Sequence, residues 1–141
     1  MMKKEFISKS INETYKIASI ILNELSNGDV VLLKGDLGAG KTNFVKGIVN
    51  ALNGNENIVT SPTFTIVNEY NVENKTIYHF DLYRINSVDE LYNIGIEEYL
   101  YSDAICFIEW PERAEELFNN NCKKIEIFKI SETERKITFN Y

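Results

Sequence analysis

The residues best suited to do chemistry form one eight-residue run, Gly35-Asp36-Leu37-Gly38-Ala39-Gly40-Lys41-Thr42. The run matches G-x-x-x-x-G-K-[ST] and lies between an apolar segment and an amphipathic one, the strand-then-helix context that this motif requires. Its glycines let the backbone curl so that N–H groups point at phosphate oxygens. Lys41 can bridge the β- and γ-phosphates, and the Thr42 hydroxyl can ligate Mg²⁺. The run therefore predicts a nucleotide-binding loop, against the alternative of a glycine-rich turn without a ligand.

An acidic residue beside the loop is the second chemical candidate. Glu109 directly follows the apolar segment Ile105-Cys106-Phe107-Ile108, so we expect it at the carboxyl edge of a sheet, next to the loop. A P-loop needs an acid at this place to hold its metal. The alternative is a strand that simply ends in solvent. Trp110 is either core packing or a cover for the phosphate pocket, and the sequence favours neither.

A third candidate is the segment Tyr78-His79-Phe80-Asp81-Leu82-Tyr83-Arg84. On a strand, alternate side chains share a face, so Phe80 and Leu82 point one way. The opposite face then carries His79, Asp81 and Tyr83. Three polar or amphipathic groups on one face suggest the wall of a site, although a half-buried strand has the same pattern. The segment Thr60-Ser61-Pro62-Thr63 lies shortly after the helix that follows the nucleotide-binding loop. P-loop proteins often carry a loop that senses the γ-phosphate at this place, but by itself the segment indicates only a turn.

The first part of the chain predicts the elements that flank the nucleotide-binding loop. A helix begins at the capping box Ser10-Ile11-Asn12-Glu13 and ends at the turn Asn27-Gly28. Its apolar stripe consists of Ile17, Ile21 and Leu25. Residues 29–33 are apolar on both faces, as in a strand of a sheet that is covered on both sides. A second amphipathic helix follows Thr42 and stops at Asn53-Gly54.

The rest of the chain predicts two hairpins, two helices and a buried strand. The expected strands span 64–70, 76–83, 104–108, 124–130 and 135–139. A capping box at Ser87-Val88-Asp89-Glu90 opens a short helix with Leu91 and Ile94 on one side. Pro111 starts a further helix at the turn where proline is tolerated. This order predicts an α/β fold, a P-loop NTPase-like mixed β-sheet flanked by helices, in a single domain over 1–141.

Composition narrows the functional classes. The chain has 141 residues, a common size for one core, with 44% hydrophobic and 26% charged residues. Its net charge of −6 argues against a chain that grips nucleic acid unaided. The apolar runs are far shorter than the roughly 20 residues that span a membrane, and the first residues do not form a signal peptide. Cys106 and Cys122 lack the spacing of a disulfide or zinc framework. We therefore expect a cytoplasmic protein.

These motifs together resemble the TsaE (YjeE) family. The segments that carry the resemblance, in the family's order, are GDLGAGKT at 35–42, SPTFTIVNEY at 61–70, YHFDLYRI at 78–85, ELYNIGIEEYL at 90–100 and CFIEWPER at 106–113. The resemblance covers essentially the whole chain, and the joint presence of SPTF, HxDxYR and EWPE is more specific than the P-loop alone. It implies a bacterial ATPase, with ATP and Mg²⁺ as cofactors, required for N6-threonylcarbamoyladenosine formation at position 37 of tRNA.

The resemblance also implies roles for individual residues. Lys41 and Thr42 would serve phosphate and metal, and Glu109 would complete the metal site. Asp81 would be needed for turnover, either through the attacking water or by holding the metal through water, and Thr63 would sense the metal or the γ-phosphate. The implied cofactor-binding residues are Asn12, Thr14, Asp36, Leu37, Gly38, Ala39, Gly40, Lys41, Thr42, Thr63, Trp110 and Arg135, with Asn12 and Thr14 near the base.

The partners implied by the resemblance are TsaD, which transfers the threonylcarbamoyl group, and TsaB. The ATP-bound chain would dock at the TsaD–TsaB pair, and hydrolysis would reset the complex. The tRNA would be held mainly by these partners, which is compatible with the acidic charge of the chain.

Three other functions are alternatives to this one. A small-molecule kinase needs lid arginines, whereas the arginines here, Arg84, Arg113 and Arg135, are scattered. A regulatory GTPase would show NKxD and DxxG, and neither motif occurs. A non-enzymatic nucleotide sensor would differ only in turnover. Because no arginine is obvious beside the P-loop, we expect slow hydrolysis by the isolated chain, unless Arg84 turns inward to act in cis.

Overall fold

In the computed structural model, which describes residues 2–141, seven strands form one sheet. The strands are β1 (Lys3–Ser8), β2 (Val30–Lys34), β3 (Val67–Val72), β4 (Lys75–Asp81), β5 (Ile105–Glu109), β6 (Lys123–Lys129) and β7 (Arg135–Asn140). The α-helices are α1 (Ile11–Leu22), α2 (Lys41–Ala51), α3 (Asp89–Asn93) and α4 (Ile96–Leu100), and the 3₁₀ segments are η1 (Glu56–Ile58) and η2 (Pro111–Leu117).

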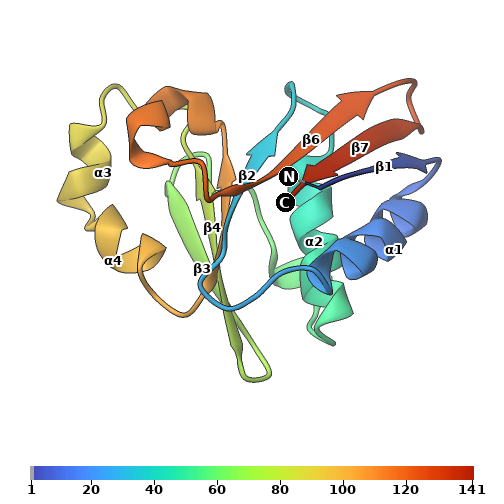
Figure 1. The fold of residues 1–141 in the computed structure, drawn as a ribbon, viewed down its shortest axis with the longest axis horizontal. Helices are drawn as coiled ribbons and strands as arrows, with labels where there is room; N and C mark the ends of the chain where they lie inside the picture. Colours follow the sequence, from blue (N-terminus) through green and yellow to red (C-terminus); the bar gives the residue numbers. More distant parts are fainter. Residues whose placement is uncertain (1) are drawn as a thin grey trace.

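The sheet is mixed, with the strand order β1-β7-β6-β2-β5-β4-β3. Its four central strands, β6, β2, β5 and β4, run parallel, and β3, β7 and β1 pair antiparallel with their neighbours. Helices α1 and α2 lie on one side of the sheet, and α3 and α4 lie on the other (Figure 1). The predicted fold class, a mixed sheet flanked by helices, is confirmed. No helix in the described part of the chain has the length and apolar character needed to cross a bilayer.

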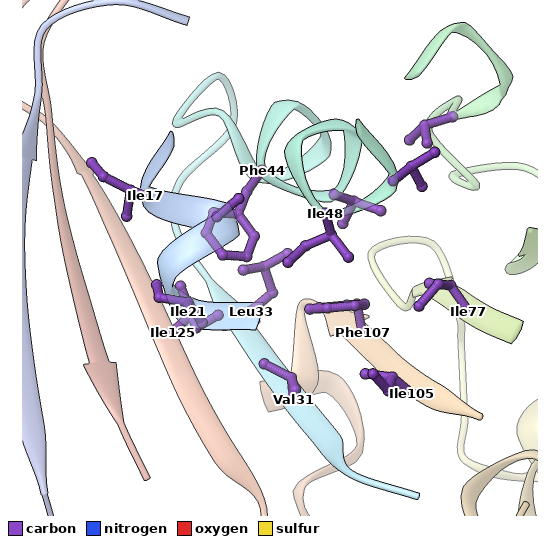
Figure 2. Close-up of a cluster of buried hydrophobic side chains, with 14 of the residues drawn as sticks. Ile17, Ile21, Val31, Leu33, Phe44, Ile48, Ile77, Ile105, Phe107 and Ile125 are labelled. Carbon is purple, nitrogen blue, oxygen red and sulfur yellow. The ribbon is translucent and has the colours of Figure 1, made fainter. Parts of the chain in front are cut away.

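Two apolar clusters hold the layers together. On one face, Phe44 and Ile48 from α2 and Ile21 from α1 pack over Leu33 and Phe107 of the sheet (Figure 2). On the other face, a second cluster joins α3, α4 and η2 to the alternate residues of the same strands. The sheet residues in that cluster are Leu32, Phe80, Cys106 and Ile108. Strands β2 and β5 are therefore buried on both faces, which explains their continuous apolar sequences.

Helix α1 begins where the sequence predicts and ends earlier than predicted. The Ser10 hydroxyl accepts a hydrogen bond from the Glu13 amide at 3.1 Å, and the Glu13 carboxylate accepts one from the Lys9 amide at 2.9 Å. The predicted end at Asn27-Gly28 is wrong, because α1 stops at Leu22 and the Asn23 amide donates to carbonyls of the last turn. The chain has to turn there to reach β2. Leu25, which lies beyond the helix, still packs on the core.

The region after β4 differs more from the prediction. The Glu90 carboxylate accepts from the Ser87 amide at 3.2 Å, but the serine hydroxyl does not cap the helix, so only half of the second capping box forms. Leu91 is buried as expected, whereas Ile94 lies beyond the five-residue helix and is exposed. Gly95, with φ 75°, then starts the separate helix α4. The helix from Pro111 is a 3₁₀ segment that is interrupted at Ala114.

The edges of the sheet were also predicted incompletely. Strand β3 starts at Val67 rather than at residue 64, because Ile66 adopts a left-handed φ of 71° just before it. Strand β4 ends at Asp81, so Tyr83 lies outside the strand. Strand β1 was not predicted. Its sequence KKEFIS is mostly charged or polar, and the segment is a strand because its backbone pairs with that of β7.

A glycine in α2 sets how closely the two helices approach. A Cβ at Gly47 would lie 2.8 Å from the Ala18 Cβ and 3.1 Å from the Tyr15 Cα. We expect Gly47→Ala to destabilise the protein by about 1–3 kcal/mol through overpacking, more than the roughly 1 kcal/mol that alanine gains in helix propensity. Urea unfolding would measure the free-energy change, with Asn50→Ala on the exposed face of α2 as the control. A Gly47→Ala protein more stable than wild type would contradict the close packing.

Candidate functional site

Three parallel strands end side by side and bring the chemical candidates to one edge of the sheet. Leu33 of β2 lies opposite Glu109 of β5, and Asp81 of β4 also lies opposite Glu109. The segment 35–42 leaves β2 at this edge and enters α2. The loop, Glu109 and Asp81 therefore meet although they are far apart in the sequence.

The loop 35–42 has the backbone of an anion-binding site. Gly38 and Gly40 have φ values of 80° and 108°, a conformation that residues with a side chain rarely adopt. A Cβ on Gly35 would lie 2.8 Å from the carbonyl oxygen of Ile127, so only glycine fits there. Gly40 is the N-cap of α2, and no side chain caps this helix. The first N–H groups of α2 and the positive end of its dipole are thus available to an anion.

Lys41 lies folded into the loop. Its ammonium donates a hydrogen bond to the Gly35 carbonyl at 2.5 Å and lies 3.7 Å from the centroid of the Trp110 ring. Burial lowers the pKa of Lys41, and the carboxylates of Glu109 and Asp81 oppose this shift. The ammonium is therefore held close to the anion-binding backbone by a carbonyl and an aromatic ring.

Trp110 both packs on the core and covers the loop, the two roles that its sequence position allowed. It packs at the edge of the cluster formed with α3 and α4, and its ring also covers Lys41 and contacts Tyr83 at a centroid distance of 4.8 Å. Its backbone adopts a left-handed φ of 59°. This strained turn between β5 and η2 places the ring over the loop, and strain of this kind is typical of functional sites.

A hydrogen-bonded chain runs from the loop into the core. The Thr42 hydroxyl donates to Glu109 Oε2 at 3.2 Å, and His79 Nε2 contacts the same oxygen at 2.5 Å. The Tyr70 hydroxyl lies 3.0 Å from His79 Nδ1. In residues 2–141 no three His, Cys, Asp or Glu side chains cluster as a metal site. A cation here would be held by Thr42, Glu109 and non-protein oxygens, the sparse set that Mg²⁺ uses with phosphates.

Asp81 connects the site to the segment 60–64. Its Oδ2 accepts a hydrogen bond from the Thr63 hydroxyl at 3.0 Å, and its Oδ1 accepts one from the Tyr83 amide at 2.9 Å. A cavity of about 260 Å³, the phosphate-sized cavity, lies between the loop and the acids Asp81 and Glu109. It is lined by Leu37, Gly38, Gly40, Lys41, Thr42, Asn43, Asp81, Glu109 and Trp110. Most of the predicted phosphate, metal and turnover residues thus border one space.

The residues expected near a base border a second cavity, of about 400 Å³. Asn12, Thr14, Gly40 and Arg135 line it. The Arg135 guanidinium donates to the carbonyls of Ala39 at 2.7 Å and Gly38 at 3.3 Å, so it holds the outer side of the loop.

Two predicted residues stand apart from these two cavities. Thr63 does not line the phosphate-sized cavity and reaches it through Asp81. Asp36 is exposed and borders a different cavity, beside Trp110 and β6.

Known proteins show the same arrangement of sequence and fold. A family model described as threonylcarbamoyl adenosine biosynthesis protein TsaE matches residues 8–137. The chain belongs to the TsaE family. Similar relatives include the tRNA threonylcarbamoyladenosine biosynthesis protein TsaE of Bacillus subtilis, 42% identical over 90% of this chain and 78% of the relative. The protein of the same name from Treponema pallidum is 37% identical over 94% of this chain and 96% of the relative.

A solved structure agrees with the fold. The crystal structure of Bacillus subtilis YdiB, which is 34% identical, aligns with a TM-score of 0.77 over 98% of this chain and 84% of that chain. Family membership and this likeness confirm the resemblance and the fold class predicted from the sequence. The segments SPTF, HFDLYR and EWPE, which carried the resemblance, meet near the loop: Asp81 and Glu109 line its cavity, and Thr63 contacts Asp81.

Two buried residues at this TsaE site were missed as site residues. The sequence placed His79 with Asp81 and Tyr83 on a face that suggested the wall of a site, but neither His79 nor Tyr70 was predicted as a site residue. The pair nevertheless leads directly to Glu109. The available signal was the position of His79, two residues before Asp81 on the strand that borders β5.

Proposed function

We propose that this chain is a Mg²⁺-dependent ATPase that acts in the cytoplasm with TsaD and TsaB in N6-threonylcarbamoyladenosine modification of tRNA. The convergence of Lys41, Thr42, Glu109 and Asp81 on one cavity at the N-terminus of α2 carries the proposal. The names of its relatives, which are tRNA threonylcarbamoyladenosine biosynthesis proteins, support the pathway. The tRNA would be bound through the partners, since this chain is acidic overall.

The loop and its lysine would bind the phosphates. The first residues of α2 line the cavity of about 260 Å³, and the Lys41 ammonium can exchange its Gly35 carbonyl for phosphate oxygens. Mg²⁺, when bound, would neutralise negative charge on the β- and γ-phosphates. Thr42 and Glu109 are the residues that would hold it. The base would lie in the neighbouring cavity with Asn12 and Thr14, where Arg135 keeps the loop in shape.

Asp81 would act on the attacking water. Its carboxylate is 4% exposed and is held from two sides by Thr63 and the Tyr83 amide. A buried carboxylate in a fixed orientation can accept a proton from water or orient it. Contact with the metal through water remains the alternative role. Thr63 would report the state of the γ-phosphate through its bond to Asp81.

The arginines explain why we expect slow turnover by the isolated chain. Arg135 is bonded to loop carbonyls, Arg84 lies over the exposed ring of Phe64, and Arg113 lies over Tyr83. Among the described residues, those that line the phosphate-sized cavity include no arginine. An arginine supplied by a partner can raise such rates by about 10³–10⁵.

The test is ATP hydrolysis by the purified chain, alone and with its cognate TsaB–TsaD pair, in the presence and absence of Mg²⁺. We expect slow hydrolysis alone and strong stimulation by the pair, with Lys41→Ala as the blank. Isolated turnover as fast as stimulated turnover would contradict the need for a partner. Hydrolysis that the pair leaves unchanged would contradict the coupled role, and a screen of small-molecule phosphate acceptors for kinase activity would follow.

A further inference from the structure

We propose that His79 and Tyr70 are positioning residues that orient the Glu109 carboxylate and connect it to the segment Thr60–Phe64. This inference rests on the proposed function, because it treats Glu109 as the acid of the metal site. It adds two residues and a physical link between the metal site and the segment 60–64, which reaches Asp81 separately through Thr63.

The burial of His79 shows how specific its contacts are. It is the single histidine of the chain, and its exposed fraction is 0%. Both ring nitrogens are engaged, Nε2 with Glu109 Oε2 at 2.5 Å and Nδ1 with the Tyr70 hydroxyl at 3.0 Å. A carboxylate only accepts hydrogen bonds, so Nε2 carries the proton and donates it. Rotation of the ring would therefore break its contacts with both Glu109 and Tyr70.

Glu109 receives both of its hydrogen bonds on one oxygen. His79 Nε2 and the Thr42 hydroxyl both contact Oε2, and no hydrogen bond within residues 2–141 uses Oε1. Two donors, one from α2 and one from β4, restrict the movement of the carboxylate. Oε1 is then the oxygen left for a ligand in the cavity that Glu109 lines. Outer partners of this kind commonly orient metal-binding side chains.

Tyr70 extends the chain to the segment 60–64. Its hydroxyl lies 3.1 Å from the Thr60 carbonyl, and the Thr60 amide donates to it at 3.3 Å. The hydroxyl has one proton, which either the Thr60 carbonyl or His79 Nδ1 can accept, but not both at once. A movement of the segment that removes the Thr60 carbonyl would leave this proton to His79. The position of the segment therefore affects the Glu109 carboxylate through two buried side chains, Tyr70 and His79.

The test compares metal affinity with nucleotide affinity. Mn²⁺ replaces Mg²⁺ as the probe, and electron paramagnetic resonance measures its binding to the protein–ADP complex. Fluorescence of Trp110, the single tryptophan, which lies over Lys41, measures metal-free ADP binding. We expect His79→Leu to weaken Mn²⁺ binding by about 10–100-fold and to leave metal-free ADP affinity unchanged.

Conservative variants separate positioning from packing. His79→Gln retains an N–H donor near the position of Nε2, so we expect it to restore most of the Mn²⁺ affinity. Tyr70→Phe retains the ring and removes only the hydroxyl, so its loss should be smaller than that of His79→Leu. Tyr78→Phe is the matched control, because Tyr78 packs against Tyr99 on the opposite face of β4. We expect it to bind Mn²⁺ as wild type does.

The outcomes distinguish this inference from the proposed function. Glu109→Gln should weaken Mn²⁺ binding, and if it does not, both the metal role of Glu109 and this inference are overturned. If Glu109→Gln weakens binding while folded His79→Leu and Tyr70→Phe proteins bind Mn²⁺ normally, only this inference is overturned. Should His79→Leu fail to fold, an affinity of His79→Gln as low as that of Glu109→Gln, or unchanged binding by Tyr70→Phe, would overturn it.

Discussion

Replacing Lys41 by alanine should lower partner-stimulated ATP hydrolysis by about 10²–10³-fold, the cost of removing one well-placed electrostatic group from a transition state. The ammonium is 3.7 Å from the Trp110 ring and bonded to Gly35 inside the loop. No other lysine lines the phosphate-sized cavity among the described residues. Without it, no lysine of the described residues would remain beside the developing negative charge. Steady-state hydrolysis measured with the TsaB–TsaD pair checks the prediction.

The control for this variant is Lys46→Ala, a lysine on the same helix that does not line the cavity. It should hydrolyse ATP at the wild-type rate. Lys41→Ala also removes the cation from the Trp110 ring, so thermal unfolding of both variants should accompany the kinetics. Hydrolysis by a folded Lys41→Ala protein within a few-fold of wild type would contradict phosphate binding by this loop.

Replacing Asp81 by asparagine should lower hydrolysis by about 10²–10⁴-fold, the range of general acid–base catalysis, while ATP binds within a few-fold of wild type. The asparagine amide can still accept from the Tyr83 amide and can contact the Thr63 hydroxyl, so the local fold should persist. What is lost is the negative charge that accepts a proton from water. Single-turnover hydrolysis and ATP titration measured through Trp110 fluorescence separate these two effects.

The matched control is Asp103→Asn, an exposed aspartate just before the opposite end of β5. It should leave hydrolysis and binding unchanged. If Asp81→Asn keeps the wild-type rate of partner-stimulated ATP hydrolysis, the catalytic role proposed for Asp81 would be contradicted. If it loses ATP binding in proportion to turnover, Asp81 would instead act in holding the metal and phosphates.

The prediction of slow isolated turnover depends on where the arginines lie. The sequence leaves open whether Arg84 turns inward, and the structure places its guanidinium 4.6 Å from the centroid of the Phe64 ring. Phe64 is 83% exposed. Phe64 belongs to the segment 60–64, whose Thr63 contacts Asp81, and Arg84 lies over its ring. We expect a partner bound at this surface to move both residues together with Thr63.

The local sequence determined the loop, the start of α1 and the buried strands. The backbone conformation of residues 35–42 follows from the residues themselves, because the conformational freedom of glycine and the start of a helix depend on only a few neighbouring residues. The Ser10–Glu13 capping box likewise uses hydrogen bonds between residues three and four apart. Continuous apolar runs at β2 and β5 indicated strands covered on both sides, since both of their faces are buried in clusters. These features follow from short-range physics, so the sequence was sufficient.

The tertiary structure alone decided which side chains meet. Thr42 and Glu109 are separated by 67 residues, and His79 and Glu109 by 30, and only the parallel register of β2, β5 and β4 brings them together. Strand β1 forms because its backbone pairs with the edge of the sheet at β7, and not because its own residues favour a strand. Hydrogen bonds between such distant residues depend on the packing of the whole sheet. For this reason the motif predicts a phosphate site, whereas the orientation of its acid through His79 and Tyr70 depends on the fold.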